Sequence, residues 1–165
     1  MTTLLPQAAT EVTPPRTFPE LAGHVRLLEA ELIGRVMAAI RTRPTYSSLD
    51  ERDLRPTVAR HVRTMLEHFA AGGSLGAEDL AFFRHMGEQR ARAGVSVRDL
   101  VFVWRSRSEA IRDAAYRLAG PSPERAVLLL RTAEVVTALD EGIVARVSGF
   151  EASLAHSSQD QRLIT

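Results

Sequence analysis

Apolar residues recur every three or four positions along most of this chain, from about residue 17 almost to its end. Such spacing is typical of amphipathic helices, whereas strict alternation of apolar and polar residues would predict strands. No window rich in β-branched residues shows that alternation. The pattern therefore predicts an all-α fold.

The first 16 residues differ from the rest, since Pro6, Pro14 and Pro15 stand among threonines with little apolar periodicity. This composition is typical of a flexible arm. We therefore expect an arm over residues 1–16, a helical domain over residues 17–157 and a tail over residues 158–165.

Start and stop signals divide the helical pattern into about five main helices. Serine and threonine cap helix starts, while proline and glycine mark helix ends. The expected caps are Thr17, Ser96 and Ser122, and the expected stops are Pro44, Gly72, Gly94 and Gly120. The expected helices span residues 19–42, 50–71, 77–93, 96–119 and 123–156.

The last of these helices is unusually long, because no convincing stop precedes His156. At 1.5 Å per residue it would measure about 50 Å. A seven-residue period, typical of a two-chain coiled coil, runs through Leu129, Ala133, Val136, Asp140, Ile143, Val147, Phe150 and Leu154. For its first half, a core helix lying across the other four is an equally good interpretation. We expect a dimer or signalling contact at Ile143, Val147, Phe150 and Leu154.

Two polar residues interrupt otherwise apolar helix faces. Arg90 shares a stripe with Phe83 and Gly87, and Asp140 lies on the stripe of the last helix. Because a buried guanidinium needs a carboxylate partner, we hypothesise an Arg90–Asp140 pair. In the alternative, the stripe is rotated and Arg90 is solvated.

Any small-molecule pocket is expected between the helices that carry these residues. Trp104 lies on an apolar stripe, which favours a place in the core over stacking on nucleic-acid bases. Glycines on a helix face more often permit close helix crossing than they bind a ligand. The candidate pocket residues are Phe83, Gly87, Arg90, Gly94, Trp104 and Asp140.

Composition narrows the possible functions. The 165 residues are 45% hydrophobic, enough for one domain with its own core. A net charge of +1 gives no long-range field toward nucleic acid or an anionic membrane. The absence of lysine excludes Schiff-base catalysis, and the absence of cysteine excludes disulfides and thiolate chemistry. No apolar stretch approaches the roughly 18 residues of a membrane span. We expect a cytoplasmic protein without membrane or direct nucleic-acid contact.

Catalytic signatures are missing. No GxSxG, HExxH, Walker A or GxGxxG sequence occurs. His61 and His68 share a helix face, but they are two turns apart, and a metal site prefers closer spacing and further ligands. We expect both to be surface or boundary residues, and we expect no enzyme activity, no metal and no cofactor.

One run resembles a family motif: residues 87–100 read GEQRARAGVSVRDL, followed by Val103-Trp104-Arg105. It is similar to the N-terminal helical domain of RsbT co-antagonist (RsbRD-type) proteins and of PucR-like transcriptional regulators. The similarity extends from about Leu21 to Leu154. The sequence departs from the motif at Val103-Trp104, where an alanine and an aromatic residue are usual, so the aromatic position is still filled.

The resemblance implies a cytoplasmic regulatory input domain with a globin-related helical bundle that lacks haem and usually forms a homodimer. In PucR-like regulators this domain precedes a helix-turn-helix domain that acts in transcription regulation. The chain ends at Thr165 without such a module, so we expect the sensor part alone, acting on a downstream domain or a signalling partner. Whether a small-molecule ligand exists stays open.

Two alternatives remain. In globin-coupled sensors a proximal histidine stands where this chain has Arg90, and arginine cannot take that role. A haem- or cofactor-binding globin-type sensor would therefore use His85 or His68. A structural module of a stressosome-like assembly would share the fold of the input domain.

Overall fold

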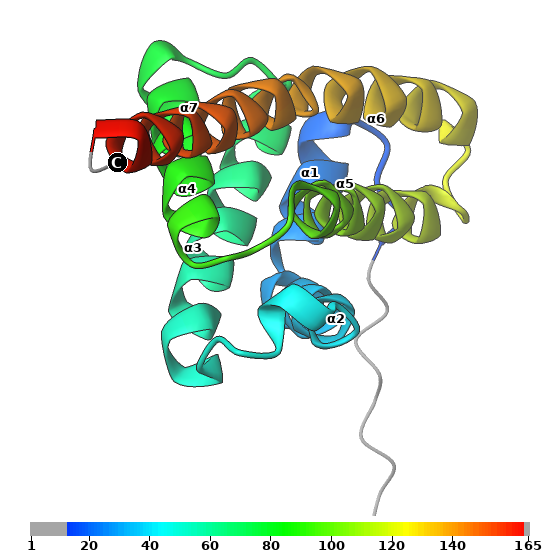
Figure 1. The fold of residues 1–165 in the computed structure, drawn as a ribbon. Coiled ribbons are helices and arrows are strands. Elements are labelled where there is room, and N and C mark those ends of the chain that lie inside the picture. Colours follow the sequence, from blue (N-terminus) through cyan, green and yellow to red (C-terminus); the bar gives the residue numbers. More distant parts are fainter. Residues whose placement is uncertain (1–12, 164–165) are drawn as a thin grey trace, which may run out of the picture.

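The computed structural model describes residues 13–163, and side chains over residues 13–156. The described part is helical and contains no strand, which confirms the all-α prediction (Figure 1). Residues 1–12 of the expected arm, and residues 164–165 of the expected tail, lie outside the described residues. The elements are α1 (Phe18–Arg26), α2 (Glu29–Arg41), the 3₁₀ turn η1 (Pro44–Tyr46), α3 (Glu51–Ala70), α4 (Ala77–Arg92), α5 (Val97–Ala119), α6 (Arg125–Leu139) and α7 (Glu141–Leu163).

The local start and stop signals of α1, α4 and α5 are confirmed. Thr17 caps α1, where its hydroxyl accepts the N–H of Glu20 at 3.4 Å. Ser96 caps α5 in the same way, accepting the N–H of Asp99 at 3.1 Å. Gly94 follows α4 with a φ of +73°, a conformation that favours glycine at helix ends. The predicted spans of α3, α4 and α5 match within two residues.

The single helix expected over residues 19–42 is wrong, because α1 and α2 are separate. The N–H groups of Leu27 and Leu28 bond three residues back, to the carbonyl oxygens of His24 and Val25. This tighter turn redirects the chain. It leaves α1 against α3, α5 and α6, and α2 against α3 and α5. Neither proline nor glycine stands at this break, so the sequence carried no stop signal.

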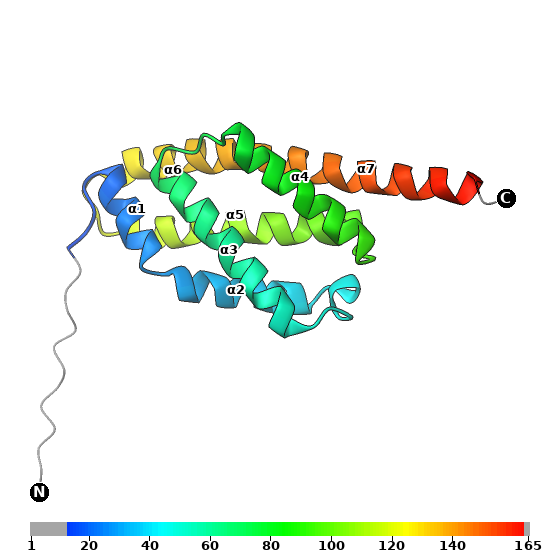
Figure 2. The same ribbon diagram turned by 90° about the vertical axis from the view of Figure 1, so that its left-hand side faces the viewer.

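The long helix expected over residues 123–156 is also interrupted. Regular helix begins at Arg125, although the Ser122 hydroxyl does accept the N–H of Glu124 at 3.0 Å. A second break at Asp140 separates α6 from α7. The two helices still follow one another along one side of the molecule (Figure 2). The buried side of α6 differs from the predicted stripe and comprises Leu128, Thr132, Val135, Val136 and Leu139.

The closest helix packing joins α4 to α7. A side chain at Gly87 would overlap the carbonyl oxygen of Arg146, and one at Gly149 would overlap the carbonyl oxygen of Arg84. Glycine at these two positions therefore lets the two backbones meet. The C-terminal part of α7 extends past the end of α4 (Figure 2).

Over the described residues, no helix combines the length and the apolar character that crossing a membrane requires.

Candidate functional site

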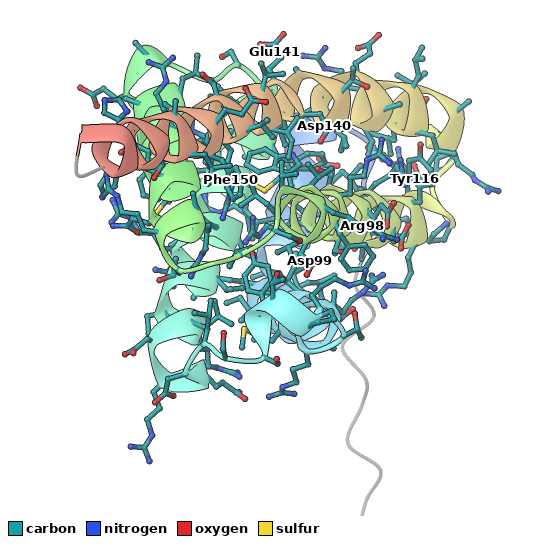
Figure 3. All side chains as sticks on the ribbon, in the orientation of Figure 1. Arg98, Asp99, Tyr116, Asp140, Glu141 and Phe150 are labelled. Carbon is teal, nitrogen blue, oxygen red and sulfur yellow. The ribbon has the colours of Figure 1, made fainter. Side chains whose placement is uncertain are left out.

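Three of the six candidate pocket residues lie together. The rings of Phe83 and Trp104 meet edge to face at 4.9 Å between centroids. The Trp104 indole donates from Nε1 to Oδ1 of Asp140 at 3.1 Å, and the Ser108 hydroxyl donates to the same oxygen at 2.7 Å. Asp140 thus faces α5 from the junction of α6 and α7 (Figure 3). This network anchors the junction to α5 and gives the Asp140 carboxylate two hydrogen-bond donors.

The two candidate glycines lie apart from this network. Gly87 is buried in the contact between α4 and α7, as its predicted role in helix crossing requires. Gly94 lies exposed in the turn after α4, with nothing within 4 Å of where a side chain would begin. Gly94 therefore does not adjoin Trp104 and Asp140.

The predicted Arg90–Asp140 pair is wrong. Asp140 is held by Trp104 and Ser108 instead. The half-buried Arg90 guanidinium carbon lies 5.8 Å from the centre of the Tyr46 ring, and its Nε has no hydrogen-bond partner. Burial lowers the pKa of Arg90 from its ordinary value. The sequence correctly indicated an inward-facing arginine but not its surroundings.

Two further arginines are buried more deeply, and sequence reasoning missed both. Arg107 on α5 is 3% exposed and Arg146 on α7 is 1% exposed. Burial lowers the pKa of Arg107 to about 9 and that of Arg146 to about 10. A signal did exist, since Arg107 follows Trp104 by three positions and Arg146 follows Ile143 by three, which places each on an apolar face.

The expectation that His61 is a surface or boundary residue is also wrong. Its ring is buried against Phe82 and Phe83, at 5.2 and 6.1 Å between centroids. Burial, followed by the charge of Arg107, Arg146 and Arg90, keeps the pKa of His61 well below 6.5. The neutral ring has no hydrogen-bond partner at either nitrogen.

Five of the buried or half-buried polar groups come from η1, α3, α4, α5 and α7, and the three arginines lie close enough to His61 for their charges to act on it. We call Arg90, Arg107, Arg146, His61 and Tyr46 the buried cation cluster. The Tyr46 phenol oxygen is buried without a hydrogen-bond partner, and the Arg90 guanidinium carbon lies 5.8 Å from the centre of its ring. Among the described residues, no carboxylate is close enough to favour the charged form of any of the three arginines. The cluster offers hydrogen-bond donors and positive charge, which suit an anion and repel a metal cation.

The other histidines offer little to a metal or haem. In the described part of the chain, no group of three or more histidine, aspartate and glutamate side chains could hold a metal ion. His68 bonds through Nε2 to Asp79 at 3.0 Å, and the exposed His85 contacts Gln89 through Nε2 at 3.0 Å. The haem alternative gains no support from these two rings.

The expected contact residues of α7 divide between two sides of the helix. Phe150 belongs to the core and lies on the inner side of α7, so it presents no surface to a partner (Figure 3). Ile143 and Val147 are half-buried, and Leu154 is 50% exposed. Val144, which the stripe omitted, is 70% exposed and lines a shallow hollow of about 300 Å³ with Ile143 and Val147.

The family model described as the RsbT co-antagonist protein rsbRD N-terminal domain matches residues 30–163. No curated protein and no solved structure matches the chain.

Proposed function

This chain belongs to the family of RsbT co-antagonist protein rsbRD N-terminal domains, which are regulatory signalling domains, and we propose that it is a non-catalytic input domain. In this proposal it forms a homodimer through α7 and passes a signal along that helix. The output is a helix-turn-helix domain of PucR-like type or a signalling partner in the cytoplasm. The domain itself binds neither nucleic acid nor membrane.

The outer face of α7 is the observation that carries this proposal. Val144 and Leu154 expose apolar side chains there, beside the half-buried Ile143 and Val147. Ile143, Val147 and Leu154 are separated by four and seven positions, the spacing of a seam between two helices. A second copy of the same helix matches this spacing, because a two-fold contact uses one surface twice.

The inner face of the same helix supports a signalling role. Gly149 lies against the backbone of α4, and Arg146 carries a guanidinium into the interior. A change in the interior around Arg146 would therefore act on the helix that carries the proposed dimer contact. Packed helices shift as rigid elements, so a small displacement at one face reaches the other.

The experiment is a light-scattering measurement of mass during size-exclusion chromatography. The wild-type chain should elute with twice the 18.2 kDa mass of one chain. Val144→Asp should shift it to the single-chain mass, because two carboxylates would meet in the seam. Leu27→Asp is the matched control, since Leu27 is 82% exposed on the turn between α1 and α2. A monomeric wild type, or equal masses for wild type and Val144→Asp, would refute pairing through this face.

A further inference from the structure

The buried cation cluster carries charge that the described chain does not neutralise. Its guanidinium groups come from α4, α5 and α7, and none has a carboxylate partner among the described residues. The buried Asp99 carboxylate accepts from the Thr45 hydroxyl at 2.7 Å, and the Asp140 carboxylate accepts from Trp104 of α5. The carboxylates of the interior are therefore engaged elsewhere.

The cluster also holds an unusual number of unused polar atoms. Arg107 Nε and both Nε and Nη1 of Arg146 are buried without a partner. The Tyr46 oxygen and both His61 ring nitrogens are likewise buried without a hydrogen-bond partner. Buried charges persist in proteins when they are paired and hydrogen-bonded. Several positively charged donors without an acceptor therefore lie in one region, which indicates that the acceptor comes from outside the chain.

We propose that the buried cation cluster is a binding site for a small oxyanion, with a phosphoryl group as the preferred ligand. Guanidinium groups bind phosphate and carboxylate oxygens through paired N–H donors. A phosphoryl group carries a charge of about −1.5 to −2 at neutral pH and three acceptor oxygens. That charge balances the two fully buried arginines, whereas a single carboxylate would balance only one.

A hollow next to the cluster supplies the entry route that we infer. It has a volume of about 410 Å³, lies between α3 and α4, and is lined by Thr57, Arg60, Phe82, His85, Met86 and Gln89. Phe82 lines this hollow and also contacts the His61 ring. The Arg60 guanidinium carbon lies 4.6 Å from the centre of the Phe82 ring. An anion would meet the positive charge of Arg60 before it reaches the cluster.

Binding at this site does not depend on pairing through α7. Only a regulatory consequence of binding rests on the proposed function, because Arg146 belongs to α7. Failure of the anion site and failure of the proposed dimer can be told apart, because Val144→Asp should abolish the dimer and leave anion binding unchanged.

The test uses the full chain, unfolded in urea, desalted and refolded in Tris chloride to remove any bound anion. Inorganic phosphate at about a hundred times its Kd should raise Tm by about 5–10 °C, whereas sodium chloride at equal ionic strength should not. Titration calorimetry with inorganic phosphate should find one site per chain, independently of any variant. Glycerol 3-phosphate distinguishes an organic phosphoryl group from free phosphate, since the better source should give the larger shift.

Variants assign the site. Arg107→Met and Arg146→Met should each raise Tm in the absence of phosphate, because they remove an unpaired buried charge. Both should also abolish the response to phosphate. Arg105→Met is the matched control on the exposed face of α5 and should keep the full response. The proposal is overturned if neither phosphate compound shifts Tm beyond chloride, if acetate shifts it more than both, or if Arg107→Met and Arg146→Met respond like wild type.

Discussion

The last two helices are attached to the rest of the molecule in two different ways. At the end of α6, the Asp140 carboxylate accepts hydrogen bonds from Trp104 and Ser108 of α5. On α7, attachment to α4 depends on the glycine contact around Gly87, and Arg146 enters the interior with Nε and Nη1 unpaired. The first attachment is complete within the chain, and the second leaves hydrogen-bonding capacity unused.

The difference separates two roles for polar residues in a core. Asp140 breaks an apolar stripe but finds its donors on the next helix, so it fixes one packing arrangement. Arg146 breaks the apolar face of α7 without an acceptor, which raises the free energy of the empty fold. A polar residue of the first kind holds structure, and one of the second kind marks a place where something can bind.

The largest effect is expected where α4 meets α7. Gly87→Ala would place a methyl group on the carbonyl oxygen of Arg146, so the two backbones must separate. Overpacking of this kind costs about 3 kcal/mol of unfolding free energy. Urea denaturation should show this loss, while Gly34→Ala, which meets nothing within 4 Å, should be neutral or stabilising. Equal stability of Gly87→Ala and wild type would show that the contact is loose.

Breaking the satisfied attachment should cost somewhat less. Asp140→Ala removes the acceptor of Trp104 and Ser108 and leaves their donors unpaired. The expected loss is about 2 kcal/mol by urea denaturation. Asp140→Asn keeps an acceptor oxygen and should lose about half as much. If alanine and asparagine are equivalent, the hydrogen bonds do not hold this junction.

The smallest effect, counted per pH unit, is a pH dependence that arises at His61 in the buried cation cluster. Burial and the charge of Arg107 lower the pKa of His61 below its ordinary value of 6.5. Below pH 6.5, His61 therefore binds a proton in the unfolded chain but stays neutral in the folded chain. The free energy of unfolding then falls by about 1.4 kcal/mol for each unit that the pH is lowered.

Denaturation curves at pH 7, 6 and 5 test this slope. His61→Gln should flatten it, since glutamine does not titrate. His85→Gln removes an exposed histidine and should keep it. Parallel slopes for His61→Gln and wild type would remove His61 as the cause.

The sequence predicted those helix ends that depend on residues within one turn. Thr17, Ser96 and Gly94 marked helix ends correctly because each acts on backbone groups within one turn. The break at Leu27 and Leu28 escaped prediction, since no local breaker stands there. The break at Asp140 lies where the indole of Trp104, 36 positions away in the sequence, donates a hydrogen bond to the Asp140 carboxylate.

The candidate site was predicted only in part. Phe83, Trp104 and Asp140 were expected together and are together. Arg107 and Arg146 were missed because arginine is almost always at the surface, and helical spacing alone does not outweigh that tendency. Arg90 was recognised as inward-facing, but the carboxylate expected to pair with it, Asp140, accepts hydrogen bonds from α5 instead.

By itself the sequence determined the helical class, most helix ends and the absence of lysine and cysteine chemistry. The tertiary structure alone decided which faces meet, which arginines are buried together and which carboxylates remain available to them. The physical reason is range: capping and helix propensity act over a few residues, whereas burial and charge pairing depend on the crossing of helices that lie far apart in the chain.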